Sequence, residues 1–431
     1  MKVSFYTLGC KVNQNETGAL ERLFCENGFS LAAPGEQADV YLVNSCTVTA
    51  GGDKKSRQWL RRAKRENPEA VTVLTGCFPQ AFATQAAAVA EADIITGTAQ
   101  RSRVLDDVLQ FLQTRRRIVD IAGHEKGEHF EELPLESFEG HTRAFLKIED
   151  GCNRRCAYCV IPRARGYVRS RAEDNILKEL AVLAKAGYRE AVLSGINLSS
   201  YGKDTGTSLG RLCQRAEAVE GLARVRLGSL EPDLMTDDEI ARLAGCGKLC
   251  QQFHLSLQSG CDRTLRAMRR VYTLDEYRAV VEKLRRAIPG AVFTTDIIVG
   301  FPGETEEDFA ESVAFVREIG FLKVHVFSYS RRPGTPAADF PGQLTEAQKL
   351  DRSHRLQQAA DETRARVIGT MAGQTAEVLL EQPVAKDLYT GYTRQYVPVL
   401  VRAPGAAQGQ LLPVRLGAWD PERERCEAAV L

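Results

Sequence analysis

The sequence lacks any long apolar run. No stretch approaches the roughly 20 apolar residues that a helix needs to cross a membrane, so we expect no membrane partner. Residues 1–20 contain no apolar signal segment and no cleavage site, which argues against secretion. The sequence also lacks a surplus of charge, because 57 Lys and Arg face 56 Asp and Glu. A formal net charge of +1 predicts no strong non-specific attraction to nucleic acid.

Histidine is scarce, whereas cysteine is abundant. None of the six histidines lies in a spacing typical of a metal or nucleophile site, but the chain has twelve cysteines. Without a secretion signal we expect a reducing, cytoplasmic compartment, in which thiols serve metal binding or redox chemistry rather than disulfides. At 431 residues and 44% hydrophobic composition, the chain is long enough for two or three globular domains.

Three cysteines lie within eight residues: Cys152, Cys156 and Cys159. Iron–sulfur clusters usually take four cysteine ligands, so a loop with three leaves one iron open for a substrate or cofactor. Zinc sites normally have four ligands in paired CxxC spacings, and the nearest histidines, His141 and His254, fit no such pattern. We interpret the loop as a catalytic iron–sulfur site, with a zinc site or three unrelated thiols as the alternatives.

The spacing of this loop, with Tyr158 before its last cysteine, resembles the cluster loop of radical S-adenosylmethionine (SAM) enzymes. In that family the open iron holds the amino and carboxylate groups of SAM, and electron transfer cleaves SAM to a 5′-deoxyadenosyl radical. The resemblance implies SAM and a 4Fe–4S cluster as cofactors. It also implies that Cys152, Cys156 and Cys159 are the ligands of the radical-generating cluster, with Tyr158 beside the cofactor.

Residues 1–112 alternate between short β-rich runs and helical patterns, which predicts an α/β domain with buried parallel strands. The strands are predicted at 3–8, 39–44 and 71–75. Cys10, Cys46 and Cys77 each come just after one of these strands, and open α/β sheets bind ligands at the carboxyl ends of their strands. We therefore expect a second iron–sulfur site with an open iron. The alternative is three ordinary buried cysteines.

Residues 143–365 contain six strand candidates that alternate with helical patterns, which predicts a parallel sheet or barrel. Six units fall short of the eight in a full barrel, so we expect an open, partial (β/α)6 barrel. The strands are predicted at 144–148, 191–193, 225–227, 253–257, 293–299 and 323–327. The cysteine loop follows the first strand, at the end of the strands where barrel enzymes place their chemistry.

Polar or glycine-rich loops follow the later barrel strands, and we expect them to hold SAM. Asn197 would bind the SAM amino group, Glu231 the ribose hydroxyls and Val299 the adenine ring. The six predicted SAM-contact residues of these loops are Gly195, Asn197, Glu231, Ser256, Gln258 and Val299. Each loop could also be only an ordinary turn. Loops of this kind at so many strand ends favour one shared site.

Residues 370–431 change in character, since Val and Leu runs alternate with Gly and Pro. This pattern predicts a small antiparallel β unit of about five strands, closed into a barrel. We therefore divide the chain into an N-terminal α/β domain (1–115), a linker (116–142), the partial barrel (143–368) and the C-terminal β-barrel (369–431).

The order of these parts resembles the radical SAM methylthiotransferases over essentially the whole chain: a three-cysteine N-terminal domain, a radical SAM barrel and a C-terminal TRAM domain. Four segments resemble the branch that acts on threonylcarbamoyladenosine tRNA, the MtaB type. They are Leu8-Gly9-Cys10-Lys11-Val12-Asn13-Gln14, the loop from Asp150-Gly151-Cys152 to Arg163-Ala164-Arg165-Gly166, residues 329–337, and Gly391-Tyr392-Thr393.

This resemblance implies that Cys10, Cys46 and Cys77 hold an auxiliary 4Fe–4S cluster whose open iron carries the sulfur to be donated. One SAM would methylate that sulfur and a second SAM would supply the radical. The methylthio group would go to C2 of N6-threonylcarbamoyladenosine at position 37, beside the tRNA anticodon. The implied partners are the anticodon loop of tRNA and an electron donor such as flavodoxin or ferredoxin.

Basic residues are unevenly placed along the chain. No acidic residue lies between Gly151 and Ala172, and the six arginines there could hold phosphates of RNA. Residues 370–431 carry six Lys and Arg against seven Asp and Glu, so this barrel is not basic overall. We therefore expect Arg394, Arg402 and Arg415 to act locally on tRNA, because RNA loops are read by stacking and base contacts as well as by charge.

Other functions fit parts of the same pattern. The same chemistry on isopentenyladenosine tRNA or on a ribosomal protein would use the same cysteines. A two-cluster electron-transfer protein or an RNA-binding protein without catalysis would also explain the thiols. The predicted barrel argues against this last reading, because an electron carrier needs no substrate cavity.

Overall fold

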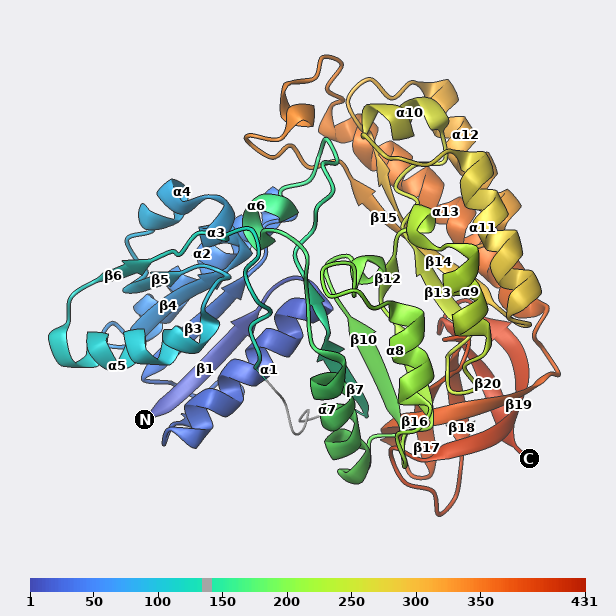
Figure 1. The fold of residues 1–431 in the computed structure, drawn as a ribbon, viewed down its shortest axis with the longest axis horizontal. Coiled ribbons are helices and arrows are strands. Elements are labelled where there is room, and N and C mark those ends of the chain that lie inside the picture. Colours follow the sequence, from blue (N-terminus) through green and yellow to red (C-terminus); the bar gives the residue numbers. More distant parts are fainter. Residues whose placement is uncertain (134–141) are drawn as a thin grey trace. The chain divides into compact units, whose positions relative to one another are not determined.

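A computed structural model describes residues 1–133 and 142–431 (Figure 1). The chain divides into two compact units. Unit 1 comprises Met1–Leu135, Lys147–Arg171 and Ser330–Ala338, and unit 2 comprises Glu136–Leu146, Ala172–Tyr329 and Asp339–Leu431. The cysteine loop thus belongs with the N-terminal sheet, whereas the domain boundaries drawn along the chain stay a prediction. Within the described ranges, no helix is both long and apolar enough to cross a membrane.

Six parallel strands form the sheet of unit 1, in the order β2-β1-β3-β4-β5-β6. Their bounds are β1 Lys2–Thr7, β2 Ser30–Leu31, β3 Val40–Ser45, β4 Val71–Gly76, β5 Ile94–Thr96 and β6 Ile118–Asp120. Every residue of β3 and β4 is buried, as expected for parallel strands covered on both faces. The predicted α/β domain is confirmed, and β6 extends its sheet into the stretch expected to be a linker.

Helices cover both faces of this sheet. Their bounds are α1 Lys11–Glu26, α2 Ala50–Glu66, α3 Cys77–Ala81, α4 Ala83–Ala87 and α5 Val104–Thr114. On one face Phe24 and Val108 pack with Val40, and on the other Leu60 packs with Val43. Successive strand residues point to opposite faces, so Val40 and Val43 belong to different cores.

The strand order places a topological switch point between β1 and β3. The chain runs from β1 to β2 on one side of β1 and returns with β3 on the other. Open α/β sheets bind ligands at such a switch point. Thr7 pairs with Asn44, and Asn44 pairs with Thr75, so the loops after β1, β3 and β4 begin at one level.

Unit 1 also contains the cysteine loop. β8 (Glu149–Asp150) pairs antiparallel with β9 (Arg169–Ser170), and α6 (Ile161–Arg165) lies between them in the chain. Gly151, between β8 and the first cysteine, has φ +85, and a Cβ there would lie 1.9 Å from the Tyr167 carbonyl oxygen. Glycine alone fits this close approach of two backbone segments.

The parallel strands of unit 2 form an open, partial barrel, as predicted. Their bounds are β7 Arg143–Lys147, β10 Glu190–Ser194, β11 Arg224–Leu227, β12 Ser229–Leu230, β13 Gln252–Leu255, β14 Val292–Val299 and β15 Lys323–Ser328. The strands form two sheets, β7-β10-β11 and β12-β13-β14-β15. Gly228 alone separates β11 from β12, so these two short strands follow one another along the chain and link the two sheets. Among the described strands, β7 and β15 stand at the two edges.

Helices follow these strands, as the alternating pattern predicted. Their bounds are α7 Glu173–Lys185, α8 Leu209–Ala216, α9 Asp237–Ala244, α10 Asp262–Ala267, α11 Leu274–Ala287, α12 Glu306–Ile319 and α13 Glu346–Gly369. Thr273, Thr305 and Thr345 begin the last three helices with reciprocal capping boxes. Each threonine satisfies a backbone N–H that would otherwise lack a partner at the helix start.

The C-terminal strands close into a five-stranded barrel in the order β16-β17-β18-β20-β19. Their bounds are β16 Thr375–Ala385, β17 Leu388–Thr393, β18 Pro398–Arg402, β19 Leu411–Asp420 and β20 Arg425–Val430. The prediction of a small closed barrel is confirmed, but β18 and β20 pair in parallel rather than antiparallel. Its core includes Val378, Val399 and Val414.

A buried ion cluster ties this barrel to the parallel strands of unit 2. Glu190 accepts from Arg226 Nε at 2.7 Å and pairs with Arg224 at 3.4 Å, and all three side chains are at most 2% exposed. Arg224 also donates to the Glu377 carbonyl oxygen of β16 at 2.6 Å. The Arg226 guanidinium lies 4.7 Å from the centre of the Tyr396 ring. Glu190 therefore pairs with two arginines that contact the C-terminal barrel, and Arg224 has Glu377 as its second carboxylate partner.

Replacing Glu190 should destabilise unit 2. In Glu190→Gln the buried Arg226 guanidinium loses its carboxylate partner, whereas Arg224 keeps Glu377, and a buried charge left without its partner costs about 3–5 kcal/mol of unfolding free energy. Urea unfolding followed at Trp419 in a Trp59→Phe background measures this. Glu362→Gln is the matched control, because the Arg317–Glu362 pair is more than half exposed and should contribute less than about 1 kcal/mol. Equal unfolding midpoints for the two variants would contradict the role given to Glu190.

Candidate functional site

Three thiols converge at the carboxyl edge of the unit 1 sheet. Cys10 caps α1 just after β1, Cys46 follows β3, and Cys77 begins α3 directly after β4. Gly9 has φ +111, and a Cβ there would lie 3.1 Å from Cys46 Sγ, so glycine lets the first loop approach the second thiol. The three cysteines form no disulfide. The structure thus brings together residues that are 31 and 36 positions apart in the chain.

The protonation of these thiols depends on burial. Burial raises the pKa of Cys77 to about 12 and also raises the pKa of Cys46. Arg165 acts on both thiols in the opposite direction. A bound metal deprotonates a coordinating thiol outright. Three sulfur donors at one sheet edge, with a glycine cradle beside them, fit an iron–sulfur cluster with one open iron.

Arg165, which the cysteine loop contributes at the end of α6, reaches into this thiol set. Its Nε donates to Cys77 Sγ at 3.2 Å, and its side chain is fully buried. Its Nη2 donates to Asn13 Oδ1 at 2.6 Å. Asn13 in turn donates to the carbonyl oxygens of Leu8 and Ser45, next to the Cys10 and Cys46 loops. One guanidinium therefore connects the cysteine loop with the edge that carries the other three thiols.

Two buried carboxylates hold Arg165 in place. Glu16 of α1 accepts from Arg165 Nη1 at 2.5 Å, and Asp150, two residues before Cys152, lies 3.3 Å from the same nitrogen. Lys147 pairs with both carboxylates. Arg101 pairs with Glu16 and also with the partly buried Glu131, and Arg169 pairs with Asp150 and also with the partly buried Glu128. The Arg165 guanidinium thus places a positive charge directly beside Cys77 Sγ, which favours an anionic, thiolate-ligated group there.

These cations also set the charge of the carboxylates. Burial by itself would raise the pKa of Glu16, but Arg101, Arg165 and Lys147 together lower it to about 2. Burial likewise opposes ionisation of Asp150, but Lys147, Arg165, Arg101 and Arg169 hold its pKa well below its usual range. Both carboxylates are therefore ionised at neutral pH.

The Cys152–Cys159 loop aims backbone N–H groups at its sulfurs. Arg154 N lies 3.4 Å from Cys152 Sγ, and Ile161 N lies 3.4 Å from Cys159 Sγ. Cys159 N donates to the Cys156 carbonyl oxygen, which closes a turn between the last two thiols. Hydrogen bonds to cluster sulfurs are one means by which proteins tune an iron–sulfur centre. The loop therefore fits a cluster, with the partly buried Tyr158 next to its last thiol.

The structure corrects, for three of the six arginines around the loop, the expectation that they hold RNA phosphates. Arg165, Arg169 and Arg171 are at most 6% exposed and pair with buried or half-buried carboxylates. Their partners Glu16 and Glu132 come from distant parts of unit 1, so the short-range absence of acidic residues was misleading. Arg154, Arg155 and Arg163 are outside this buried set, and the last two are exposed.

All six predicted SAM-contact residues belong to unit 2. Gly195 and Asn197 follow β10, Glu231 follows β12, Ser256 and Gln258 follow β13, and Val299 ends β14. The carboxyl ends of these adjacent parallel strands meet at one edge, so the structure brings the six residues to one level of the sheet. Their contact with SAM stays a prediction.

Three of the six are held or covered by their surroundings. Glu231 forms an ion pair with the buried Arg270, so its carboxylate is fixed before any ribose arrives. Gln258 has φ +71, and its N–H donates to the Asp296 carbonyl oxygen at 2.8 Å. A non-glycine residue in this backbone region is held there by its surroundings, which is common at binding sites. Val299 is only 1% exposed, so adenine would meet a nearly covered side chain there.

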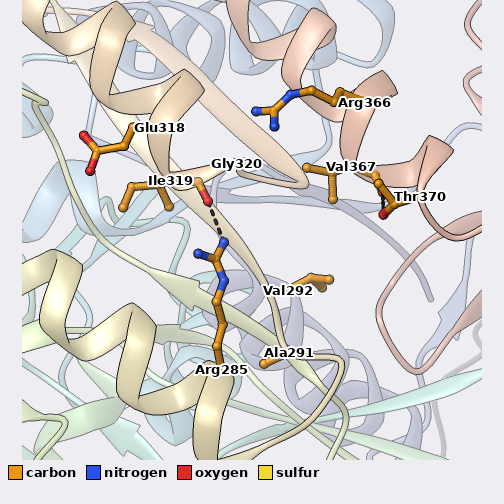
Figure 2. Close-up of a pocket in the computed structure, with 9 residues that line it drawn as sticks. All are labelled: Arg285, Ala291, Val292, Glu318, Ile319, Gly320, Arg366, Val367 and Thr370. Carbon is orange, nitrogen blue, oxygen red and sulfur yellow. Dashed lines mark hydrogen bonds between the residues drawn. The ribbon is translucent and has the colours of Figure 1, made fainter.

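A separate cavity of unit 2 lies at the opposite end of the strands (Figure 2). Its volume is about 270 Å³, and it borders Val292, the first residue of β14, and Ile319, the last of α12. Arg285 donates into it, to the Ile319 carbonyl oxygen at 2.6 Å. Ligands of parallel sheets bind at the carboxyl ends, so this cavity is not the SAM site.

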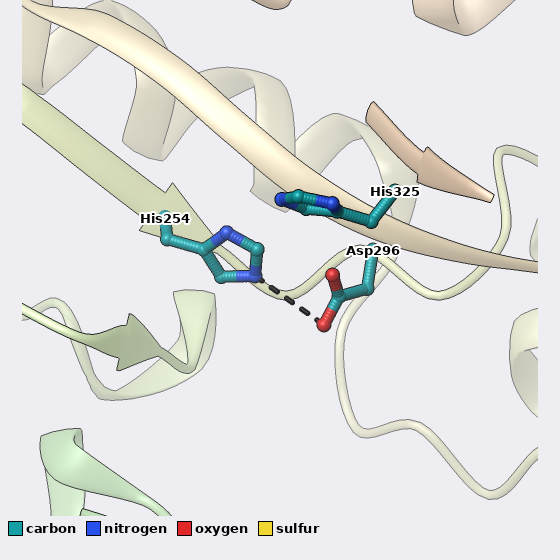
Figure 3. Close-up of side chains that lie close together, drawn as sticks. All are labelled: His254, Asp296 and His325. Carbon is teal, nitrogen blue, oxygen red and sulfur yellow. Dashed lines mark ion pairs between the residues drawn. The ribbon is translucent and has the colours of Figure 1, made fainter. Parts of the chain in front are cut away.

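Two histidines and an aspartate that the sequence did not single out lie together in unit 2 (Figure 3). His254, Asp296 and His325 each offer one ligand atom, and these atoms lie within 4.8 Å of one another. The histidines are 71 positions apart in the sequence, so no local motif indicates that they lie together. Strand register brings them together, because Asp296 pairs with His325 and Thr294 pairs with His254.

Removing the Arg165 guanidinium should destabilise unit 1. Arg165→Gln leaves Glu16 and Asp150 buried with one cation fewer, so we expect the cluster-free, reduced chain to lose about 3–5 kcal/mol. Urea unfolding followed at Trp59 in a Trp419→Phe background measures it. Arg163→Gln is the control on the same helix, since exposed Arg163 donates to the carbonyl oxygens of Pro333 and Ala81 and, among the described residues, pairs with no carboxylate. Indistinguishable midpoints would argue against the network.

The lowered pKa of Glu16 predicts a pH dependence. The folded pKa of about 2 lies below the ordinary 4.5, so the stabilisation is present above pH 5 and is lost as the pH falls toward 2. The shift corresponds to about 3 kcal/mol, of which about 2 kcal/mol is lost between pH 7 and pH 3. The urea midpoint of the cluster-free chain should therefore fall more steeply with acid than that of Glu16→Gln. Parallel declines would contradict this assignment.

Two family profiles match the chain. The Radical SAM superfamily matches residues 146–316, and Uncharacterized protein family UPF0004 matches residues 2–97. The first match includes Cys152, Cys156 and Cys159, and the second spans Cys10, Cys46 and Cys77. The two thiol sets thus lie in two different matched segments.

Relatives match nearly the whole length. The chain is 39% identical over 420 residues to threonylcarbamoyladenosine tRNA methylthiotransferase MtaB of Bacillus subtilis (strain 168), covering 96% of this chain and 93% of that protein. It is 40% identical over 364 residues to MtaB of Aquifex aeolicus (strain VF5), covering 83% and 87%. It is also 36% identical over 390 residues to tRNA-2-methylthio-N(6)-dimethylallyladenosine synthase of Clostridium novyi (strain NT), covering 88% and 86%.

A solved structure shares the fold. The radical S-adenosylmethionine methyltransferase TsrM from Kitasatospora setae, with cobalamin and a [4Fe-4S] cluster bound, superposes with a TM-score of 0.57 at 16% identity, covering 78% of this chain and 74% of that one.

These matches confirm the resemblance that the cysteine motifs indicated. The predicted use of SAM and iron–sulfur chemistry is confirmed with the superfamily, and the chain is an enzyme of the transferase class. By its identity to relatives over nearly its full length, the chain belongs to the radical SAM methylthiotransferases, in the MtaB-type branch.

Proposed function

We propose that this protein adds a methylthio group to C2 of N6-threonylcarbamoyladenosine at position 37 of tRNA, with two 4Fe–4S clusters and two molecules of SAM. One observation carries the proposal: unit 1 contains two separate sets of three cysteines, and the buried Arg165 links them. Each set lacks a fourth thiol, so each leaves one iron open. One open iron would bind SAM, and the other would bind the sulfur that is transferred.

The residues of unit 1 would hold both clusters. Cys152, Cys156 and Cys159 would bind the cluster that supplies the electron for SAM cleavage, and Cys10, Cys46 and Cys77 the cluster that supplies the donor sulfur. Radical chemistry suits the target, because an aromatic C–H has no acidic proton for a base to remove. Arg165 would keep a positive charge against Cys77 Sγ, and Asn13 would fix the loops on either side.

The residues of unit 2 would bind SAM and exclude water around it. Asn197 is buried after β10 and offers an amide to the SAM amino group. Glu231, fixed by Arg270, would accept from ribose hydroxyls. The constrained turn at Gln258 would present its backbone to the adenosine part of the cofactor.

The C-terminal barrel offers a defined contact for tRNA. Arg402 and Arg415 both pair with Ala429 of β20, from opposite sides, and all three are exposed. Two neighbouring strand spacings separate the arginines by about 10 Å, so the pair can hold two phosphates of one backbone. Arg394 is not part of this pair, because its guanidinium donates to the backbone carbonyl oxygens of Gly247 and Leu249.

The remaining partners follow from this chemistry. An electron donor such as flavodoxin or ferredoxin would reduce the cluster of the Cys152–Cys159 loop, and the cytoplasm would be the site of action, where tRNA and reduced thiols occur together. A second candidate substrate is dimethylallyladenosine tRNA, because relatives named as its methylthio synthases are 32–36% identical to this chain.

Two cysteine variants test the proposal. Cys156→Ala should abolish both 5′-deoxyadenosine formation and product, because the radical-generating site is lost. Cys77→Ala should still form 5′-deoxyadenosine but no methylthio nucleoside. The assay is anaerobic, with dithionite, SAM and threonylcarbamoylated tRNA, and uses mass spectrometry of nucleosides.

Cys25→Ala is the control, because Cys25 lies in α1 outside both sets and should change neither product. Product from Cys77→Ala would overturn the role of the N-terminal thiols. Product on dimethylallyladenosine tRNA alone would assign the second substrate.

A further inference from the structure

The inner face of β13, β14 and β15 carries partly exposed side chains that take no part in the two proposed iron–sulfur sites. Residues alternate between the two faces of each strand. Phe253, Phe293 and Ile297 form the covered face and are almost fully buried. His254, Asp296 and His325 lie on the opposite face. Ser256, two positions after His254 and just past the end of β13, continues this face. This inner face therefore continues from the predicted SAM edge toward the middle of the strands.

The polar end of this face is a compact cluster (Figure 3). His254 Nδ1 lies 3.0 Å from Thr294 Oγ1, and His254 Nε2 lies 3.4 Å from Asp296 Oδ2. The rings of His254 and His325 are 5.9 Å apart. Burial by itself would raise the pKa of Asp296, but the hydrogen bond from His254 and the charges of His254 and His325 lower it. The cluster thus offers an anionic acceptor beside two imidazole donors.

The apolar end of the same face lies one step nearer the carboxyl edge. Phe327 is two positions after His325 on β15, and Ile298 is two positions after Asp296 on β14, where it pairs with Phe327. Phe327 is 46% exposed, although large hydrophobic side chains in strands are normally covered. An exposed aromatic ring on an inner sheet face is a surface on which a planar base can stack.

We propose that this face binds the adenosine to be modified, with its base on Phe327 and its N6 substituent at the cluster of His254, Asp296 and His325. The inference rests on the proposed function and names the residues that select its substrate. A threonylcarbamoyl group carries N–H and hydroxyl donors together with a carboxylate. Asp296 accepts from the donors, and the imidazole of His325 donates to the carboxylate. A dimethylallyl substituent has neither group and leaves the cluster unsatisfied, which penalises its binding.

The test compares two anticodon stem-loops that differ only at position 37, one with unmodified adenosine and one with threonylcarbamoyladenosine. Fluorescence anisotropy measures their dissociation constants with the cluster-reconstituted full chain, without reductant, so turnover plays no part. The wild type should prefer the modified loop. Asp296→Asn and His325→Ala should bring the ratio of the two constants toward one and change binding of the unmodified loop less than about two-fold.

The aromatic platform makes a separate prediction in the same assay. Phe327→Ala should weaken both loops by about 10- to 100-fold, since base–aromatic stacking contributes that much per base, whereas Phe327→Tyr should bind like the wild type. His354→Ala, on the exposed side of α13, is the control and should change nothing.

Three outcomes overturn the inference. Asp296→Asn and His325→Ala could leave the ratio unchanged, or the wild type could methylthiolate threonylcarbamoyladenosine tRNA without preferring the modified loop. A stoichiometric zinc ion that His254→Ala removes would make the cluster a metal site instead. Failure of the proposed function looks different: the wild type would then form 5′-deoxyadenosine but no methylthio product on this tRNA.

Discussion

The hydrogen bond from Arg165 to Cys77 Sγ is the contact on which the account of unit 1 depends. It joins a loop that carries three thiols to a sheet edge that carries three others. Glu16 and Asp150 keep the guanidinium charged and oriented. Asn13 accepts a hydrogen bond from Arg165 and donates to the backbone next to Cys10 and Cys46. A fully buried arginine needs such partners, because an unpaired charge inside a protein is strongly destabilising. The same network therefore supports the fold and places positive charge against Cys77, a proposed cluster ligand.

The register of parallel strands brings distant residues together in both units. It sets Cys10, Cys46 and Cys77 at one edge in unit 1, and it sets His254, Asp296 and His325 on one inner face in unit 2. In both cases residues that are far apart in the sequence become neighbours because adjacent strands start at the same level. The loops remain free to vary while the strands fix the distances, which is why this fold class places its chemistry at strand ends and inner faces.

Patterns that repeat along the chain were predictable, and contacts between distant segments were not. The period of apolar residues predicted the α/β domain, the six barrel strands and the small C-terminal barrel, and the position of cysteines after strands predicted their convergence. Strands as short as Ser30–Leu31 leave no period to detect. The ion pair of Arg165 could not be predicted from neighbouring residues either, since its partner Glu16 is 149 positions away in the sequence. For the same reason a run of arginines without nearby acids suggested a phosphate site, although Arg169 and Arg171 pair with carboxylates from other segments.

Unit 1 is proposed to hold two iron–sulfur clusters on two independent sets of thiols. Iron and sulfide per chain, counted after anaerobic reconstitution of the wild type, Cys77→Ala and Cys156→Ala, test this proposal most directly. Two four-iron clusters predict about eight irons in the wild type and about four in each variant. About four irons in the wild type, unchanged in Cys77→Ala, would show that Cys10, Cys46 and Cys77 hold no cluster and would contradict the account.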